Sequence, residues 1–357
     1  MRWKKTTAKT TKINRAASHG LEHYCRDLDG WPRSWMGLEK DLPPGEQLLT
    51  LFRPFLEHLA ASNLSPKTIQ KHVDNVWAVG FSDEGDENAR QPLALHWDGV
   101  EWTEVPTPRP HRYSGLSGVA VVATDDIWAV GYQGKWGIDF EGEQPMSMHW
   151  DGVEWSVVAT PTFAGRYVNH LRSVAALAGD DVWAVGETGW PDPFLTLVFH
   201  NDGSGWTQVD SPSPGSRQST LEGVVALAPD NVWAVGFQYV ERFGRRTLVE
   251  HWGGASWNVV PSPNHQSGWS YMLGVAAAAP DDIWAAGFNN RGGPWYPLAF
   301  HWDGISWQLV ELPDTGISDI ARAAAVLPGG EAWVVGEAVF QGGWQRTLIE
   351  RLQCNKP

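Results

Sequence analysis

A five-residue motif recurs six times in this chain and constrains its fold more than any other feature. It reads VWAVG in three copies and IWAVG, IWAAG or AWVVG in the others, with its tryptophan at positions 77, 128, 183, 233, 284 and 333. The period is therefore about 50 residues, a length found in repeat architectures that bury their core by packing one copy against the next. Of the 23 tryptophans, 20 lie at or after Trp77, so the repeat places them.

Each copy has the pattern of four short β-strands. In one complete copy the predicted strands are residues 171–178, 181–186, 195–200 and 205–212, which we letter A to D in order. Turn residues such as APDD join A to B, and Asp-Gly or Gly-Gly pairs join C to D. Four strands in about 50 residues are typical of a propeller blade. The sequence predicts an all-β, six-bladed propeller.

The first and last copies are predicted to be incomplete. Strand A is recognised only in copies two to six, and strand D only in copies one to five. The total is 22 strands, whereas six blades of four strands would need 24. Because a propeller hides its sheet edges by closing its ring, we expect unpaired edges in the first and last blades.

The motif, a variable loop, and then TLVEHWGGASW and VVPSP resemble the repeat of kelch and galactose-oxidase-like propellers over residues 74–357. The chain has a single glycine where that family commonly has a pair, and tryptophan where tyrosine is usual. The resemblance implies a divergent kelch-like propeller. Related propellers include copper oxidases and enzymes that act on glycans, so the same scaffold is compatible with an enzyme.

The chain before the repeat has a different character. Residues 1–20 carry six basic residues and no acidic one, which predicts a basic disordered tail. Residues 21–73 are predicted to be α-helical, with apolar side chains at helical spacing in 48–59 and Ser65-Pro66 beginning a second helix. The stretch FRPFLEHLAASNLSPKTIQKHV resembles the N-terminal core-binding, SAM-like module of tyrosine recombinases and phage integrases.

That resemblance implies DNA association, which would rest on Lys4, Lys5, Arg53, Lys67 and Lys71. The Arg, Lys, His-x-x-Arg and Tyr series that the family uses for catalysis does not follow. The string DN-apolar-Trp fits both the end of the helical module and the start of the repeat. We therefore hypothesise that the chain is a chimeric fusion joined at this short homology, inside a blade.

Charge and cysteine content exclude several classes. The net charge is −14, so nucleic-acid binding is unlikely to be a property of the whole molecule. Two cysteines, Cys25 and Cys354, give no disulfide framework and no zinc spacing, and no cofactor is expected. No apolar run or signal peptide is recognised, so we expect no membrane contact and a cytoplasmic, monomeric protein, although the propeller could derive from a secreted one.

Antiparallel strand order assigns the connections to two faces. The A–B and C–D turns share one face, and the long, diverse B–C and D–A loops share the other. Aromatic and arginine side chains on non-repeating loops are those that binding hot spots use, so the loop face is predicted to bind a protein or a glycan. The candidate residues are Arg112, Tyr113, Trp136, Arg166, Tyr167, His170, Trp190, Arg217, His265, Trp269, Tyr271, Trp295 and Trp344.

The histidines, acidic turn residues and tryptophans that recur in the copies are expected to have structural roles. The histidines of the His-Trp pairs (96, 149, 251 and 301) suggest metal ligands, but no carboxylate or second histidine is recognised beside each, so we expect structural hydrogen bonds. The acidic turns supply too few oxygens for calcium, and no metal site is predicted. The six motif tryptophans are expected to pack between blades because their place is the same in every copy. They are Trp77, Trp128, Trp183, Trp233, Trp284 and Trp333.

The sequence therefore favours a non-catalytic binding module. Copper radical chemistry would need a cysteine beside a tyrosine, and the propeller's only cysteine is Cys354 at its end. A sialidase would need an arginine triad and Asp-box turns, which are not found. A glycan-acting or sugar-oxidising enzyme remains the first alternative, and DNA association through residues 21–73 the second.

Overall fold

The computed structural model describes residues 76–83, 89–99, 101–135, 142–266, 268–290, 292–313, 317–327, 331–340 and 345–353. The predicted tail, the predicted helical segment and the candidates Trp136 and Trp344 lie outside these residues. The chain divides into two compact units, 1–76 with 97–103, and 77–96 with 104–357. In the first unit, the indole rings of Trp97 and Trp102 lie 5.8 Å apart. The second unit carries blades 2 to 6 of those numbered below, with most of β1 and β2.

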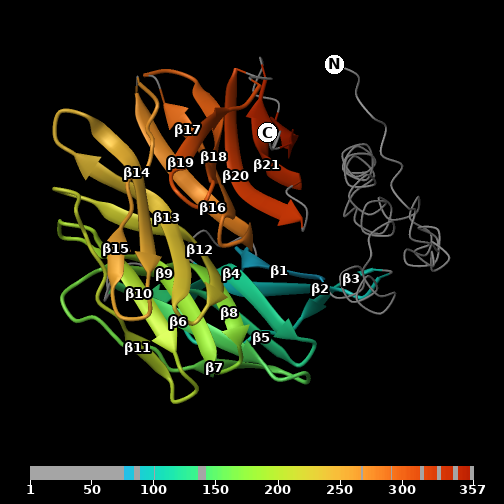
Figure 1. Ribbon diagram of the computed structural model, residues 1–357. Coiled ribbons are helices and arrows are strands. Elements are labelled where there is room, and N and C mark those ends of the chain that lie inside the picture. Colours follow the sequence, from blue (N-terminus) through green and yellow to red (C-terminus); the bar gives the residue numbers. More distant parts are fainter. Residues whose placement is uncertain are drawn as a thin grey trace, which may run out of the picture. The chain divides into compact units, whose positions relative to one another are not determined.

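The described residues form six antiparallel sheets, which we number as blades 1 to 6 (Figure 1). The two three-stranded sheets are blade 1, with β1 (Val76–Ser82), β2 (Gln91–Trp97) and β3 (Trp102–Val105), and blade 6, with β20 (Ser318–Leu327), β21 (Glu331–Val339) and β22 (Gln345–Gln353). Blades 2 and 3 contain β4 (Tyr113–Ala123), β5 (Asp126–Lys135), β6 (Gly142–Trp150), β7 (Trp155–Val158), β8 (Val168–Ala178), β9 (Asp181–Gly189), β10 (Leu195–Asn201) and β11 (Trp206–Gln208). Blades 4 and 5 contain β12 (Ser219–Ala228), β13 (Asn231–Val240), β14 (Gly244–Trp252), β15 (Trp257–Val259), β16 (Trp269–Ala279), β17 (Asp282–Asn290), β18 (Trp295–Trp302) and β19 (Trp307–Glu311).

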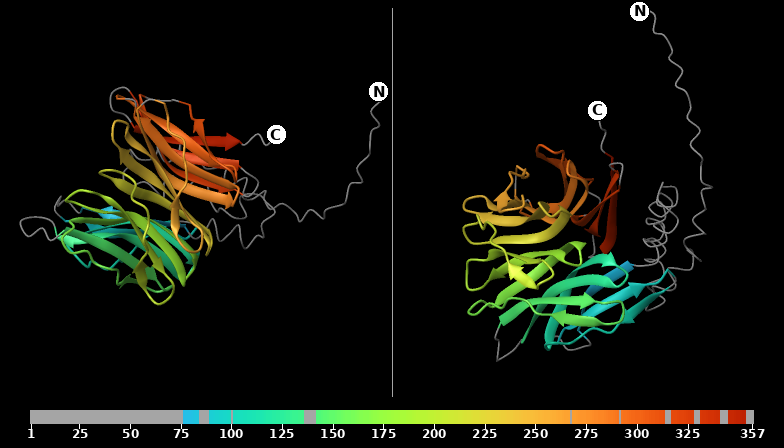
Figure 2. Two further views of the ribbon diagram at one scale, coloured as in Figure 1. Left: turned by 60° about the vertical axis from the view of Figure 1, so that its left-hand side comes forward. Right: turned by 60° about the horizontal axis from the view of Figure 1, so that its bottom comes forward.

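The six-bladed propeller predicted from the repeat is confirmed. Consecutive strands pair within each blade, and the blades follow one another in chain order (Figure 2). The first strand of each of blades 2 to 6 is the inner one, because β4, β8, β12, β16 and β20 contact one another in succession. Among the described residues blade 1 has no inner strand and blade 6 no outer strand, as the count of 22 strands predicts. This part of the chain contains no helix.

The inner strands contact one another through small residues. Each carries a bulge, as between Leu221 and Gly223 in β12, and the residue after the bulge faces the next inner strand. A Cβ on Gly223 would lie 3.2 Å from the Cα of Gly274, and a Cβ on Gly274 would lie 2.9 Å from the Cα of Ala323. Larger side chains at these positions would push the inner strands apart.

The motif glycine is required by the inner strand of its own blade. A Cβ on Gly236 would lie 2.0 Å from the carbonyl oxygen of Thr220, its neighbour on β12. The same approach, 1.9 or 2.0 Å from an inner-strand carbonyl oxygen, holds at Gly131, Gly186, Gly287 and Gly336. The recurring glycine therefore allows the inner two strands of five blades to come into contact.

Motif tryptophans lie between consecutive blades. Trp183 of blade 3 is 2% exposed, and its ring lies 5.1 Å from that of Trp252 and 5.6 Å from that of Trp257, both in blade 4. Val185 of blade 3 and Leu248 of blade 4 belong to the same apolar cluster. Burying aromatic and aliphatic surface in such joints is the main stabilising contribution of this fold.

The next joint along the chain repeats this packing. Trp233 of blade 4 is buried, and its ring lies 4.8 Å from that of Trp302 and 6.0 Å from that of Trp307, both in blade 5. The Trp233 indole also donates to the side-chain oxygen of Asn231 at 2.8 Å. Three further motif tryptophans are buried in apolar clusters shared with the following blade: Trp77, Trp128 and Trp284.

Trp333 of blade 6 departs from the expectation that every motif tryptophan packs between blades. Its side chain is half-buried, and its described contacts lie within its own blade. The indole donates to a carboxylate oxygen of Glu331 at 3.1 Å, and the Arg351 guanidinium lies 5.9 Å from the ring centroid. In the earlier joints the covering rings come from the next blade in chain order, and blade 6 is the last blade that the structure describes. The position of Trp333 in the repeat is therefore the same, but its surroundings differ.

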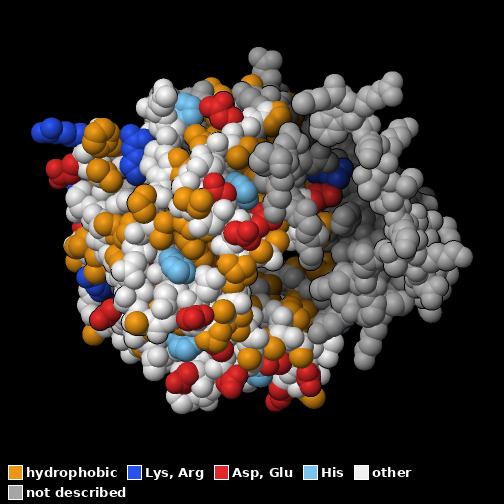
Figure 3. Space-filling view, in the orientation of Figure 1, with side chains coloured by type: hydrophobic (Ala, Val, Ile, Leu, Met, Phe, Trp, Pro, Cys, Tyr) orange, Lys and Arg blue, Asp and Glu red, His pale blue; other side chains and the backbone are white. Residues whose placement is uncertain are grey.

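The expectation that no carboxylate stands beside the repeated histidines was wrong for His149 and His301, because an A–B turn aspartate lies beside each. The Nε2 atom of His200 lies 2.9 Å from Oδ1 of Asp181, which also accepts a hydrogen bond from the Trp183 indole at 3.1 Å. The same arrangement joins His251 to Asn231 and His301 to Asp282, while His149 meets Asp126. These partners are about 20 residues apart in the chain, so adjacency in sequence does not reveal them. Figure 3 shows histidine side chains at the surface among apolar ones.

A search of the described residues for a helix long and apolar enough to cross a lipid bilayer found none.

Candidate functional site

The two faces of the propeller differ as the strand order requires. On the turn face, Gly152, Gly203, Gly254 and Gly304 adopt positive φ of 87° to 94° in near-identical C–D turns. Asp151 accepts hydrogen bonds from the backbone N–H groups of Val153 and Glu154, which lower the pKa of its carboxyl. The loop face has no such regularity and carries the candidate residues.

Trp190, Tyr167 and Arg166, which we call the Trp190 cluster, form an exposed group where the loop after β9 meets the loop before β8. The Trp190 side chain is 55% exposed and that of Tyr167 is 39% exposed. The carbonyl oxygen of Trp190 accepts the Tyr167 N–H at 2.9 Å, and the two rings lie 6.2 Å apart, edge to face. Arg166 donates to the carbonyl oxygen of Pro193 at 2.9 Å.

The backbone of Trp190 is itself unusual. Its φ is 43°, a left-handed conformation that a bulky residue rarely adopts. Such conformations cost about 1–3 kcal/mol and persist where surrounding contacts hold them, often at binding sites. Here the contacts to Tyr167 and Arg166 hold the loop while the indole stays exposed. The Trp190 cluster is therefore an aromatic surface fixed in place before any ligand arrives.

A second group of candidates is occupied by an arginine of the protein itself. The Arg245 guanidinium lies over the rings of Trp269 and Tyr271, 5.5 and 5.8 Å from their centroids, and donates to the Tyr271 hydroxyl at 3.2 Å. Tyr271 is only 7% exposed, whereas Trp269 is 41% exposed. Because Arg245 belongs to blade 4 and both rings to blade 5, this contact joins two blades.

Blades 1 and 2 are joined in the same way. The Arg90 guanidinium lies 4.3 Å from the ring centroid of Phe81 and 5.0 Å from that of Tyr113, and donates to the Tyr132 hydroxyl at 3.1 Å. Asp83 pairs with the same guanidinium at 3.3 Å. Tyr113 and Tyr271 thus each contact an arginine of the preceding blade and help to join two blades.

The two histidine candidates are also engaged. The Nε2 atom of His170 lies 2.5 Å from a carboxylate oxygen of Glu143, linking blade 3 to blade 2. His265 is half-buried, and its Nε2 atom lies 3.6 Å from Glu311.

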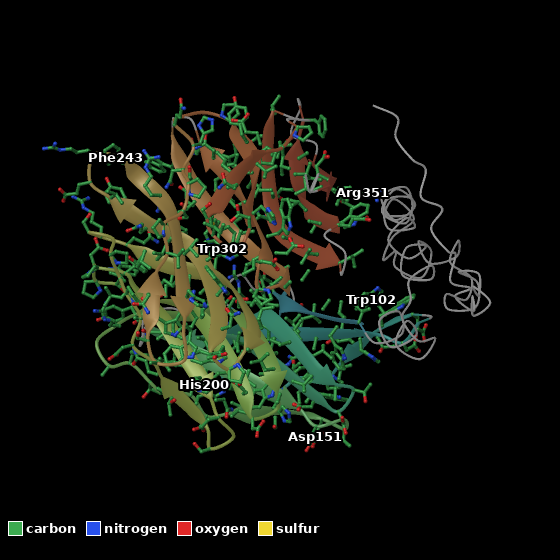
Figure 4. All side chains as sticks on the ribbon, in the orientation of Figure 1. Trp102, Asp151, His200, Phe243, Trp302 and Arg351 are labelled. Carbon is green, nitrogen blue, oxygen red and sulfur yellow. The ribbon has the colours of Figure 1, made fainter. Side chains whose placement is uncertain are left out.

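The remaining described candidates are exposed at the rim. Arg217 lies over the ring of Tyr239 at 5.7 Å, and Arg112 contributes its carbonyl oxygen to the N–H of Arg90. Trp295 is 38% exposed and begins β18. Exposed Phe243 lies at the tip between β13 and β14 and is a loop-face aromatic that the sequence prediction missed (Figure 4).

A charged group on the inner strands was also missed. Arg172, at the bulge of β8, pairs with Glu187, whose other oxygen accepts a hydrogen bond from the Thr220 hydroxyl at 2.9 Å. Burial alone would raise the pKa of Glu187, but these contacts outweigh it and hold the pKa below its ordinary value. Glu222 lies at the bulge of β12, and burial raises its pKa to about 7 although Arg172 opposes this.

Glu250 on β14 is a buried carboxyl in an apolar position. Its side chain is 0% exposed and neither oxygen has a hydrogen-bond partner, so burial raises its pKa to about 8. In blades 2, 3 and 5 the equivalent residues, immediately before the histidine of strand C, are Met148, Phe199 and Phe300, all fully buried.

Among the described residues, no group of three or more His, Cys, Asp or Glu side chains is arranged to hold a metal ion.

The comparisons with known proteins give remote similarities. No protein-family model matches the chain, and no curated protein does. A solved structure described as "YCF48 bound to D1 peptide" is 14% identical, with a TM-score of 0.36, covering 80% of this chain and 90% of that one. One described as "Glycoside hydrolase" is 12% identical, with a TM-score of 0.40 and coverages of 83% and 96%. A protein from Lactobacillus plantarum is 11% identical, with a TM-score of 0.44 and coverages of 78% and 82%. Similarity at this level assigns neither an activity nor a ligand.

Proposed function

We propose that this propeller is a non-catalytic module that binds a protein partner through its loop face, with the Trp190 cluster as the centre of the contact. One observation carries the proposal: Trp190 is 55% exposed and yet fixed by a hydrogen bond and ring contact to Tyr167. Trp, Tyr and Arg are the residues most enriched at binding hot spots, and all three are present in this cluster.

Rigidity strengthens the case. An exposed side chain that is already ordered loses little conformational entropy when a partner binds, so more of the contact energy becomes affinity. The other exposed aromatics of the loop face, Phe243, Trp269 and Trp295, lie on blades 4 and 5 and provide further apolar area. On the turn face the most exposed apolar side chains are aliphatic rather than aromatic: Val153 and Ile305 are 82% and 85% exposed.

Quantitative affinity capture from a lysate of the natural host tests the proposal. The protein would carry a photo-crosslinking amino acid at exposed position 164, beside the Trp190 cluster, or, as the control, at position 305 on the turn face. We expect a discrete protein crosslinked from position 164 only, and its capture from that position lost on Trp190→Ala and Tyr167→Ala but kept on Ile305→Ala. Equal crosslinking from both positions would contradict a loop-face site.

A glycan ligand is the second candidate, because an exposed, fixed indole face also suits stacking against a sugar ring. Binding on a glycan array that is lost on Trp190→Ala, without any crosslinked protein, would support this alternative.

A catalytic role is favoured by one observation only. The pKa values of Glu187 and Glu222 are displaced in opposite directions, as in pairs that act as base and acid. Glu187 is nevertheless engaged by both Arg172 and Thr220, which leaves it poorly placed to react. Release of reducing sugar from a polysaccharide panel, abolished by Glu222→Gln, would favour the enzyme over the binding module.

A further inference from the structure

Blade 1 keeps a motif glycine that its own structure does not need. In the other five blades this glycine approaches an inner-strand carbonyl oxygen so closely that a Cβ would lie 1.9 or 2.0 Å from it. A Cβ on Gly80 of β1 would meet nothing within 4 Å. Among the described residues, no strand of the kind that the glycine accommodates elsewhere lies beside β1, which stands at the edge of its sheet.

Apolar side chains that are buried in the other joints are exposed where blade 6 would meet blade 1. Val335 on β21 is 39% exposed, whereas its equivalents Val130, Val185 and Val235 are each 0% exposed and pack against the following blade. On the side of blade 1, Ala78 is exposed. Its equivalents Ala129, Ala184, Ala234 and Ala285 are 0% exposed.

The inner strand of blade 6 shows the same lack of a neighbour. Ala325 on β20 is exposed, while Ala175 and Val225, at the equivalent place on β8 and β12, pack into the joint that follows. Ala323, the small residue after the bulge, is exposed as well. Three strands therefore present surfaces shaped for inner-strand contact that no described residue covers.

The two strands not found among the described residues would be consecutive in a repeat. In the described part of the chain, blade 6 has no outer strand and blade 1 has no inner strand. In every joint within the chain, an outer strand leads through one loop to the inner strand of the next blade, as β11 leads to β12 within residues 206–228. One such segment could therefore complete both sheets.

We propose that the joint between blade 6 and blade 1 is a docking site for one outer strand, loop and inner strand of this repeat type, supplied by another polypeptide. Its outer strand pairs with β22 and its inner strand pairs with β1, which is addition of strands to exposed sheet edges. The surface continues the row of inner-strand contacts from β4 to β20. The chemistry of the occupant follows: small residues after a bulge, Ala or Val along the inner strand, and no proline there.

The experiment uses the full chain and a fluorescent peptide of residues 206–231, which contains β11 and β12. Anisotropy should show saturable binding at a ratio of one to one, and the melting temperature of the protein should rise with peptide concentration. The Val224 N–H points away from the paired strand to the Ser173 hydroxyl, so the N–H of its neighbour Val225 points toward it. The same peptide carrying Val225→Pro, which removes that donor, should bind at least about tenfold more weakly.

Gly80→Ala is the decisive variant. Since a Cβ on Gly80 would meet nothing within 4 Å, the unliganded variant should melt at the same temperature as the wild type, but its Cβ would collide with the docked strand's carbonyl oxygen. Peptide affinity should fall at least about tenfold. Gly253→Ala on the turn face, where a Cβ also meets nothing within 4 Å, is the matched control and should bind normally.

Either of two results would overturn the proposal. One is that the folded wild-type protein shows no saturable binding of the peptide up to about 100 μM. This holds also if the wild-type protein forms a dimer and binds no peptide. The other is a Gly80→Ala variant that binds the peptide as tightly as the wild type does.

Discussion

The Oδ1 atom of Asp282 lies 2.9 Å from the Nε2 atom of His301, and the same oxygen accepts the indole N–H of Trp284 at 3.0 Å. This buried carboxylate thus connects strand C, the motif tryptophan and the A–B turn of blade 5. Asp282→Ala would leave two buried polar groups without their partner, so we expect unfolding free energy to fall by about 2 kcal/mol. Urea denaturation measures the loss. The exposed neighbour Asp281 is the control, and its alanine variant should change stability by less than about 0.5 kcal/mol.

Stability should depend on the ionisation of Glu250. Burial raises the pKa of this carboxyl to about 8 from an ordinary 4.5. The native state therefore holds the proton more tightly than the unfolded state, and stability falls as pH rises from about 4.5 to about 8. Glu250→Met, which places there the residue found at position 148, should raise the unfolding free energy at pH 8 by up to about 4 kcal/mol.

The gain from Glu250→Met should shrink steadily towards pH 4.5, where the wild-type carboxyl is protonated in both states. Denaturant titrations at several pH values follow this. Glu350, the equivalent residue of blade 6, is half-buried, and burial raises its pKa in the same direction. Glu350→Met should give a smaller change, and a pH-independent gain at Glu250 would rule out the linkage.

Gly236→Ala should be among the most damaging small substitutions. The added methyl group would lie 2.0 Å from the Thr220 carbonyl oxygen, a contact that only separation of β12 from β13 relieves. A loss of about 3 kcal/mol or more in unfolding free energy is expected. Thermal denaturation followed by circular dichroism tests this, and a variant as stable as the wild type would mean that the two strands are further apart.

Removing the Arg245 side chain should loosen the joint between blades 4 and 5. Arg245→Ala deletes a hydrogen bond to the Tyr271 hydroxyl and the stacking over Trp269, for an expected loss of about 1–2 kcal/mol. Because Trp269 would gain contact with water, tryptophan emission should shift to longer wavelength. Arg242→Ala, at an exposed position, should leave both stability and emission unchanged.

Regular features of the fold could be predicted from the sequence because each is local or periodic. The spacing of Trp77, Trp128 and the later motif tryptophans identifies the blades, and the turn residues identify the strand order. The incomplete first and last blades follow from the same count. The inner strands were predicted too short: β4 and β16 begin at Tyr113 and Trp269, which were assigned to loops, because their first residues lack the small apolar pattern.

The repeat predicts where a residue stands but not what surrounds it. Trp233 and Trp333 occupy the same place in VWAVG and AWVVG, yet Trp233 is buried against blade 5 whereas Trp333 is half-buried. The difference arises because a described blade after blade 4 supplies Trp302 and Trp307, whereas none of the described residues plays that part for Trp333. Identical local sequence therefore does not ensure identical burial at the end of the repeat.

Contacts between distant residues could not be predicted. Asp181 and His200 meet because β9 and β10 pair in a register that only the folded sheet defines. The arginines over Tyr113 and Tyr271 come from the preceding blade, so single-chain patterning cannot distinguish them from ligand-binding arginines. Glu250 stands at a position that is apolar in most other blades, and comparing the copies side by side could have indicated it.

On the inner strands, the residue after the bulge is restricted to small side chains, whereas the bulge residue itself varies. The residue after each bulge is small because it touches the main chain of the next strand, as Gly223 and Gly274 do. The bulge residue itself is Ser117, Arg172, Glu222, Leu273 or Arg322 in successive blades. Main-chain contact thus sets the spacing between inner strands. The bulge residues can therefore differ in charge from blade to blade without changing that spacing.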